Sequence, residues 1–220
     1  MLIPTRNRAE LIPVLLHNIL DTVSNPHAIE IVFGVDDDDT HTQHTISTIT
    51  PSLPIKIQTI VSPRPARGYQ DIHLLYNELA SYSNGKYLWI FNDDVTIKSL
   101  QWDVVLHTVP DHKKIVQCDV FGDGRQVDAN MFPILHSDIQ RVLGFIGIHS
   151  SIDVQYELIS EKLPHIWHRE TSISVHHDGH PVSSTLNAPI FNPAAIRFMT
   201  SEIDAICHTI STTFPQYNEH

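Results

Sequence analysis

The sequence predicts an α/β fold in which a mostly parallel central sheet is flanked by helices within a single domain. Two observations lead to this prediction. Short apolar, β-rich segments alternate with segments of helical spacing, and this alternation is typical of parallel strands connected by helices. The 220-residue chain also shows no internal repeat and no linker, and this length is sufficient for one large domain.

The first elements follow from the spacing of apolar residues. Apolar side chains recur at helical spacing between residues 9 and 23 and predict a helix there, although Pro13 removes one helical hydrogen bond. Asn25-Pro26 ends this helix. The Thr-, His- and Pro-rich residues 40–54 are compatible with a short helix and a turn. Three segments have strand character: residues 1–4, 29–35 and 56–61.

The middle of the chain continues the alternation. Residues 71–83 have the apolar spacing of an amphipathic helix, and Asn84-Gly85 directly after them is a good helix end. Residues 86–91, KYLWIF, predict a buried strand. The rest of the chain is less regular, with strand candidates over residues 115–120 and 172–176 and helix candidates over residues 137–143, 152–163 and 193–210.

Charge and composition exclude several classes of function. The formal net charge of −11, with histidine neutral, leaves no basic stripe for nucleic acid. A nucleotide is not excluded, because a divalent metal can carry the positive charge. Cys118 and Cys207 form no CxxC pair, so reduced thiols and a cytoplasmic location are expected. No apolar run reaches the ~20 residues that cross a bilayer, which predicts no transmembrane segment but leaves room for association with a membrane surface.

Two acidic clusters follow two of the predicted strands. Residues 36–39, the aspartates of VDDDD, come directly after the strand at residues 29–35, and residues 92–94, NDD, follow the strand at residues 86–91. In parallel α/β sheets ligands bind beyond the carboxyl ends of the strands, so both clusters fall where an active site is expected. Carboxylate oxygens suit a hard cation such as Mg²⁺ or Mn²⁺. Either cluster taken alone is also compatible with a solvated loop.

Four motifs, in order, resemble those of family 2 glycosyltransferases of the GT-A fold: PTRNR at residues 4–8, VDDDD at 35–39, YNELA at 76–80 and GKYLWIFNDDV at 85–95. Members of that family typically show a P-T-x-N-R opening, a V-D-D-x-S strand end, an Asn-bearing helix and a DxD segment. The resemblance implies one GT-A domain in two parts. Residues 1–98 are the nucleotide-sugar-binding part, and residues 99–220 bind the acceptor and hold the catalytic base.

The resemblance also implies roles for individual residues. Pro4 and Thr5 lie beside the nucleotide base. Asp37 accepts a hydrogen bond from the base, and Asp36 braces the turn or the ribose. The last two aspartates of the run are expected to be mostly solvated. The other residues implied in nucleotide binding are Arg6, Arg64 or Arg67, Asn77 and Asp93.

A divalent metal, Mn²⁺ or Mg²⁺, is implied as a cofactor. Its ligands would be Asp94 and a histidine of the VHHDGHP segment. His177 is the first choice, with His176 and His180 as alternatives, and a plain His-rich loop is the competing interpretation. Asn92 stands where many members of the family have a third acid, which leaves one carboxylate fewer for the metal.

For the second part, the resemblance implies a general base in the SSID segment, where Asp153 is the candidate. Glu157, one turn later, and the more distant Asp128 are its substitutes. An acid in the first turn of a helix is also a plain helix-start pattern, which is the competing explanation for Asp153.

The function implied by the resemblance is metal-dependent transfer of a sugar, with inversion, from a UDP- or GDP-sugar to a glycan or another hydroxyl acceptor. Two alternatives stay open. A nucleotidyltransferase on a similar sheet is one, but PTRNRAEL lacks the Gly-rich loop expected after its first strand. A non-catalytic carbohydrate- or partner-binding relative is the other, and a hydrolysis assay with nucleotide sugars separates it from an enzyme.

Overall fold

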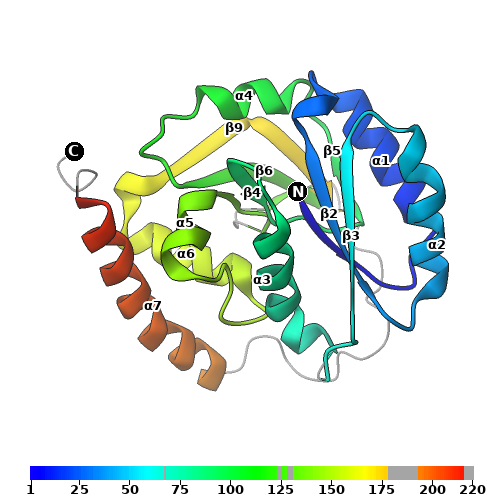
Figure 1. The fold of residues 1–220 in the computed structure, drawn as a ribbon. Helices are drawn as coiled ribbons and strands as arrows, with labels where there is room; N and C mark the ends of the chain where they lie inside the picture. Colours follow the sequence, from blue (N-terminus) through cyan, green and yellow to red (C-terminus); the bar gives the residue numbers. More distant parts are fainter. Residues whose placement is uncertain (67, 123–124, 128–130, 178–192, 216–220) are drawn as a thin grey trace.

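Three parallel strands build one end of the sheet. The computed structural model describes residues 1–66, 68–122, 125–127, 131–177 and 193–215 (Figure 1). The parallel strands are β1 (Leu2–Thr5), β2 (Glu30–Asp36) and β3 (Lys56–Ser62), in the order β1-β2-β3. Their carboxyl ends therefore meet at one edge, and the VDDDD run ends β2 at that edge.

The other described strands form a mixed sheet in the order β4-β8-β6-β9-β5, with β7 paired to β6. They are β4 (Tyr87–Trp89), β5 (Val95–Ile97), β6 (Ile115–Gly122), β7 (Arg125–Val127), β8 (Ile134–His136) and β9 (Trp167–His177). A backbone hydrogen bond from Phe91 to Leu2 (3.1 Å) and a parallel bridge between Leu2 and Ile90 join β4 to β1. The α/β prediction is confirmed. Within the described residues, the parallel pairings are those among β1–β3, the link between β1 and β4, and β6 with β9.

Helices cover both faces of the three parallel strands. The described helices are α1 (Leu11–Thr22), α2 (Thr40–Ile49), α3 (Ile72–Tyr82), α4 (Trp102–Thr108), α5 (Ser137–Leu143), α6 (Ile152–Lys162) and α7 (Pro193–Thr213). In Figure 1, α1 and α2 lie on one side of these strands and α3 on the other, while α7 packs against α5 and α6. None of the described helices combines the length and the apolar composition needed to cross a bilayer.

The alternation of side chains along the strands explains this covering. Ile3 and Phe33 belong to the apolar cluster that includes α1, whereas their neighbours Leu2 and Val32 belong to the cluster that includes α3. All four side chains are buried with no exposed area. Consecutive residues of a strand face opposite sides of the sheet, so strands that are apolar at every position need a helix layer on each face.

Most predicted elements occur within a few residues of their expected bounds. Pro13 is the third residue of α1, where its missing N–H costs nothing because the first N–H groups of a helix have no helical partner. The sequence does not predict β5, β7, β8 or α4, which are short. β9 is also longer than the predicted strand over residues 172–176, because it pairs with β6 along one side and with β5 along the other.

One prediction about the VDDDD run is wrong, because Asp39 is not solvated but only 4% exposed. Its carboxylate accepts a hydrogen bond from the backbone N–H of Thr42 at 3.2 Å and caps α2. The same carboxylate accepts the backbone N–H of Asn7 at 2.6 Å. Asn7 has a φ of 52°, so Asp39 also holds the left-handed residue of the turn that follows β1. Asp38 is half-exposed, in agreement with the prediction, but it is paired with Arg6.

We expect Asp39→Ala to lower the free energy of unfolding by about 1–2 kcal/mol, because α2 loses its cap and the turn at Asn7 loses its acceptor. Urea denaturation at neutral pH measures this loss. Asp37→Ala, on an exposed side chain of the same run, is the matched control and should change stability by less than about 0.5 kcal/mol. Equal effects of the two substitutions would contradict the structural role of Asp39.

Candidate active site

The two acidic clusters meet at the carboxyl edge of the parallel strands. Asp93 and Asp94 follow β4 and are only 5% and 8% exposed. Because β1 lies between β2 and β4, the loop that follows it, residues 4–8, reaches both clusters. Arg6 is paired with the VDDDD run, and Arg8 is paired with Asp93 and Asp94.

Asp93 is held by groups of the chain itself. Its Oδ2 accepts a hydrogen bond from the hydroxyl of Thr5 at 2.6 Å, and its Oδ1 lies 2.5 Å from Nη1 of Arg8. Burial raises the pKa of Asp93, and the contacts with Thr5 and Arg8 offset only part of that effect. With both oxygens engaged, Asp93 anchors the loop after β1 and fixes the guanidinium of Arg8 beside Asp94.

The two carboxylate oxygens of Asp94 have different surroundings. Its Oδ2 lies 3.2 Å from Nη1 of Arg8, whereas its Oδ1 is buried and makes no hydrogen bond within the described residues. Nε2 of His177, at the end of β9, lies 3.4 Å from this Oδ1. Burial by itself would raise the pKa of Asp94, but His177 and Arg8 outweigh burial and keep the pKa below its ordinary value.

These two side chains fit part of the ligand set of a divalent cation. A carboxylate oxygen and an imidazole nitrogen both occur as ligands of transition-metal ions, and a buried carboxylate oxygen without a partner is costly. Among the described residues, no group of three or more His, Cys, Asp or Glu side chains forms a metal site. The protein therefore offers Asp94 and His177, and a cation there would complete its coordination with water or with phosphate oxygens of a ligand.

A buried tyrosine fixes the turn that carries the acids. Tyr76, on α3, is 4% exposed, and its Oη lies 3.0 Å from the carbonyl oxygen of Phe91 and 2.9 Å from Oδ1 of Asn92. A phenol has one hydrogen to donate, so the two acceptors share it. Asn92 thus directs its side-chain oxygen toward α3, where it accepts a hydrogen bond from Tyr76.

The charges of Asp153 and Asp94 both act on one tyrosine. Asp153 lies in the first turn of α6, as the SSID pattern predicts. Burial raises its pKa, and the backbone N–H groups of Val154 and of Asp153 itself offset only part of this effect. Tyr69, in the 3₁₀ turn Gly68–Asp71, has a pKa raised first by burial and then by the nearby charges of Asp153 and Asp94. Tyr69 is therefore close to both Asp153 and Asp94.

The VDDDD run forms the other side of the cluster. Nη1 of Arg6 lies 2.5 Å from Oδ2 of Asp36, and Arg6 is also paired with Asp38. Arg64 is exposed. The pKa of Asp38 is lowered mainly by Arg6 and to a smaller extent by the charge of Arg64, which indicates that Arg64 lies near the run. Asp37 is exposed at the strand end. This side therefore carries exposed groups of both signs.

Some predicted residues stand apart from the cluster. The amide of Asn77 is bound to the backbone of Ile146 and Gly147, so the structure gives it a role in holding that loop instead of facing the acids. His176 neighbours His177 on β9 and faces the opposite side of the sheet by alternation. Glu157 is exposed on α6. Three predicted residues lie outside the described residues: Arg67, Asp128 and His180.

Sequence reasoning missed three residues of the cluster. Arg8 closes the PTRNR motif, and its proximity to two acids depends on β1 lying next to β4. Tyr76 is the first residue of YNELA, but its apolar spacing marks it only as a core residue. Tyr69 lies in a turn without a recognisable pattern. Arg8 and Tyr76 could have been found by their positions within motifs, whereas Tyr69 could not.

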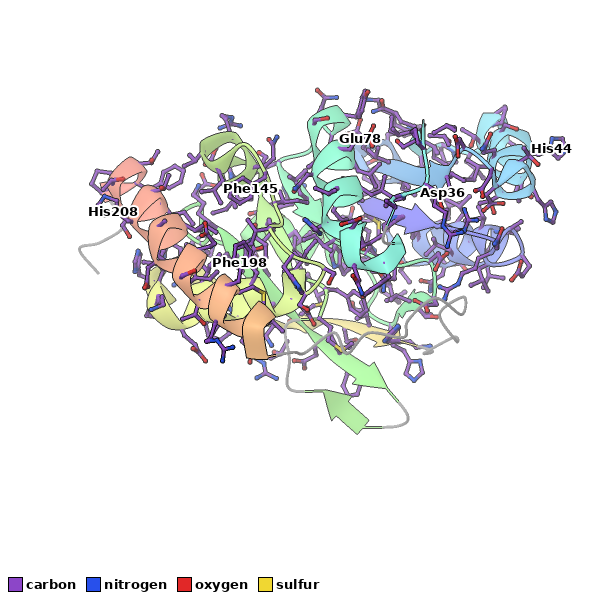
Figure 2. The ribbon with its side chains drawn as sticks, turned by 90° about the horizontal axis from the view of Figure 1, so that it is seen from below. Asp36, His44, Glu78, Phe145, Phe198 and His208 are labelled. Atoms are coloured by element: carbon purple, nitrogen blue, oxygen red, sulfur yellow. The ribbon has the colours of Figure 1, made fainter. Side chains whose placement is uncertain are left out.

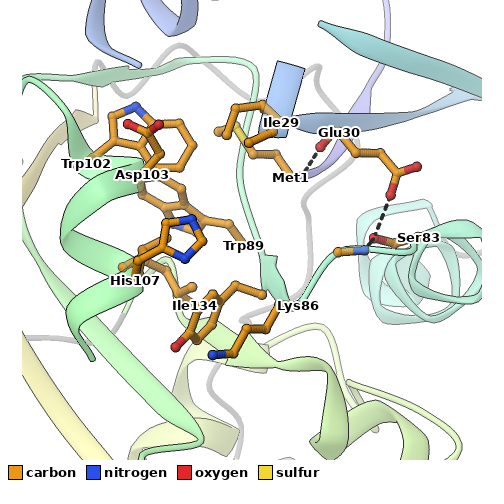
Figure 3. A pocket seen from close by; sticks show the side chains of 14 residues that line it. Met1, Ile29, Glu30, Ser83, Lys86, Trp89, Trp102, Asp103, His107 and Ile134 are labelled. Carbon is orange, nitrogen blue, oxygen red and sulfur yellow. Dashed lines mark hydrogen bonds between the residues drawn. The ribbon is translucent and has the colours of Figure 1, made fainter. Parts of the chain in front are cut away.

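A pocket of about 120 Å³ lies at the opposite end of the sheet, where β1, β2 and β4 begin (Figure 3). Trp89 and Trp102 line it, and both are core residues with less than 4% exposure. The acids at its wall are already engaged. Asp103 accepts the backbone N–H groups of residues 24–25 at 2.8 and 2.9 Å, and Glu30 is paired with Lys56. The pocket is therefore a packing gap and not the candidate site.

The sheet order and the acidic strand ends at one edge define a GT-A type of α/β fold. The sequence model described as Glycosyl transferase family 2 matches residues 1–154. The chain belongs to this family, which confirms the resemblance found in the motifs. No curated protein matches the chain.

Solved structures show the same fold. S. aureus TarS (residues 1–349), in complex with UDP-GlcNAc, superposes with a TM-score of 0.68 at 13% identity over 93% of this chain. The mannosyltransferase PcManGT from Pyrobaculum calidifontis, in complex with GDP-Man and Mn²⁺, superposes with a TM-score of 0.64 at 11% identity over 96% of this chain. The chain spans 65% and 63% of those two proteins, respectively. A putative glucose-1-phosphate thymidylyltransferase from Bacillus anthracis superposes less well, with a TM-score of 0.52 at 6% identity over 92% of this chain and 94% of its own.

We expect Arg8→Ala to destabilise the fold by about 3 kcal/mol at pH 7, because it leaves two buried carboxylates without their cation. The loss should shrink at pH 4.5. Burial already raises the pKa of Asp93, so Asp93 takes up a proton on acidification while the protein is still folded, and a neutral carboxyl needs no ion pair.

Urea denaturation of the wild type and the variant at both pH values measures this difference. Arg141→Ala, which breaks the exposed ion pair with Asp138, is the control and should cost less than about 1 kcal/mol at either pH. A loss for Arg8→Ala that is as large at pH 4.5 as at pH 7 would show that the carboxylates are not the cause.

Proposed function

We propose that the protein is a metal-dependent glycosyltransferase that moves a sugar from a nucleotide-diphosphate donor to an acceptor hydroxyl with inversion. One observation carries this proposal: Asp93 and Asp94 are buried at the carboxyl edge of the parallel strands, with Arg8 and His177 beside them. Membership of glycosyl transferase family 2 and the likeness to folds solved with UDP-GlcNAc or GDP-Man support it.

The nucleotide of the donor, UDP or GDP, is proposed to bind beside the VDDDD run. Asp37 is exposed at the end of β2, where its carboxylate is available to accept from the base. Asp36 is fixed by Arg6 and lines the ribose side. Pro4, near the end of β1, lies next to the loop between the two clusters. Arg64, which is exposed, supplies charge for the phosphates. Arg67 is proposed for the same task.

Charge decides how the diphosphate is held. Two carboxylates and one guanidinium leave Asp93, Asp94 and Arg8 with one net negative charge, which by itself repels a diphosphate. Asp94 and His177 would hold a Mn²⁺ or Mg²⁺ ion, which when bound would supply positive charge for the leaving group. Arg8, kept in place by Asp93, adds a fixed cation beside the departing phosphates.

Asp153 is the proposed general base. Its raised pKa makes its carboxylate a stronger base than that of an exposed aspartate. It removes the proton of the acceptor hydroxyl as that oxygen forms the new bond to the anomeric carbon. The bond from this carbon to the diphosphate breaks on the opposite face, which inverts the centre. The proposed acceptor is a glycan or another hydroxyl compound. We also propose that the reaction takes place in the cytoplasm, where the protein could contact a membrane surface.

We expect Asp94→Ala to abolish the effect of Mn²⁺ on donor binding, because it removes the carboxylate that is proposed to bind the ion together with His177. Asp153→Asn should keep donor affinity and lower transfer by about 10²–10⁴-fold, the usual contribution of general-base catalysis. Calorimetry with UDP- and GDP-sugars, with and without Mn²⁺, measures the first effect, and a transfer assay measures the second.

Donor binding that is equally weak with and without Mn²⁺ would sink the metal-dependent proposal. The product identifies the reaction, because sugar transfer and donor hydrolysis release a nucleoside diphosphate, whereas a nucleotidyltransferase releases pyrophosphate from a nucleoside triphosphate. A protein that binds a nucleotide sugar and releases neither product is a non-catalytic relative.

The pH dependence of turnover should report on Asp153. Only the ionised carboxylate accepts a proton, so kcat should rise with pH through a pKa above the ordinary aspartate value and then level off. The profile is measured at saturating donor and metal. Asp153→Asn should lose this acidic limb, and a variant that keeps it would assign the limb to another group.

A further inference from the structure

The loop that joins α5 to α6, residues 144–151, is held by two side chains from opposite directions. Asn77 reaches it from α3, in the nucleotide part of the chain, and Gln155 reaches it from α6. The loop begins at Gly144, whose φ of 76° ends α5 in the left-handed conformation that glycine adopts without strain. It ends at the turn of α6 that carries Asp153.

Asn77 binds the loop through its amide. Its Oδ1 accepts the backbone N–H groups of Ile146 at 2.7 Å and Gly147 at 2.8 Å, and its Nδ2 donates to the carbonyl oxygen of Gly147 at 2.8 Å. Ile146 and Gly147 are both buried. Without Asn77 their backbone groups would be left without partners away from water, which is costly.

Gln155 completes the hold from the other side. It is fully buried, with no exposed area. Its Oε1 accepts the backbone N–H of Ile148 at 2.9 Å, and its Nε2 donates to the carbonyl oxygen of Ile146 at 3.2 Å. The two amides therefore bind three consecutive loop residues, and Gln155 lies only two positions after Asp153.

The loop is packed closely against both helices at Gly147. A Cβ added at Gly147 would lie 2.9 Å from the side chain of Ile152 and 3.1 Å from Cβ of His73. Gly147 therefore fits where a larger residue would press on α3 and on the first residue of α6. Ile152 immediately precedes Asp153, so the loop and the start of α6 pack together next to the acid.

We propose that Asn77 and Gln155 are positioning residues for Asp153. They set the loop, and through it the first turn of α6, so that the carboxylate is directed at the Asp94 cluster while neither amide touches the donor. This assignment rests on the proposed function, because it takes Asp153 as the base. It also replaces the nucleotide-binding role that the Asn-bearing helix suggests for Asn77.

The experiment compares Asn77→Ala and Gln155→Leu with a matched control, Asp103→Ala. Asp103 is also a buried side chain that accepts two backbone N–H groups of a loop, but it lies at the opposite end of the sheet. Both test variants should lower kcat by about tenfold or more and change the donor dissociation constant by less than about twofold. The control should keep kcat even if it loses as much thermal stability.

Two further readouts separate positioning from general damage. The acidic limb of the pH profile should shift in Asn77→Ala, because the surroundings of Asp153 change. Hydrogen exchange of the amides of Ile146 and Gly147 should accelerate in the same variant, and this measurement does not depend on turnover.

Four results would overturn the inference. The first is a donor dissociation constant raised tenfold in Asn77→Ala with kcat unchanged, which would make Asn77 a nucleotide ligand. The second is a fall of kcat in Asp103→Ala as large as that in the test variants, and the third is unchanged exchange at Ile146 and Gly147. A wild-type protein that transfers no sugar from any UDP- or GDP-sugar would instead overturn the proposed function, and the catalytic role of the loop with it.

Discussion

The site depends on one constraint: carboxylates gathered at a single sheet edge must be neutralised or hydrogen-bonded, and the loop after β1 does this. Successive residues of that loop serve the two clusters in turn. Thr5 and Arg8 hold Asp93, while Arg6 and Asn7 hold the aspartates that end β2. Because β1 lies between β2 and β4, one short loop compensates both groups. Acids that would repel one another in isolation become fixed parts of a site.

Asp94 differs from Asp39 and Asp93 in how its oxygens are held. The four carboxylate oxygens of Asp39 and Asp93 all accept hydrogen bonds from the chain. Oδ1 of Asp94 instead accepts none from the described residues and faces His177 across 3.4 Å. Of these three acids, Asp94 is therefore the one whose carboxylate depends on a histidine for compensation.

The second part of the chain is connected to this edge through α3. Tyr76 on that helix braces the turn before Asp93, and Asn77, the next residue, binds the loop that leads to α6. Adjacent residues of one helix point in directions about 100° apart, so a single helix contacts both the turn before Asp93 and the loop before Asp153. Helix α3 thus connects these two segments, which lie far apart in the sequence.

Local sequence patterns predict the fold class and most of the acids at the carboxyl edge of the sheet. The alternation of strands and helices predicts the parallel strands, and the acids at the ends of β2 and β4 predict where a ligand binds, since both are properties of short segments. The sequence likewise predicts Asp153 as an acid in the first turn of a helix, which is α6. The short elements β5, β7, β8 and α4 are not predicted, because a strand of three residues is stabilised by its neighbours and carries too little pattern of its own.

The sequence by itself determined that four aspartates stand in a row and that an NDD group follows another strand, which suffices to place acids at the sheet edge. Only the tertiary structure decided what each acid does. Asp37 is exposed, Asp39 caps α2, and Asp93 is occupied by Thr5 and Arg8. The physical reason is that a carboxylate's role depends on which donors reach it, and these donors come from β1, whose place between β2 and β4 no local pattern states.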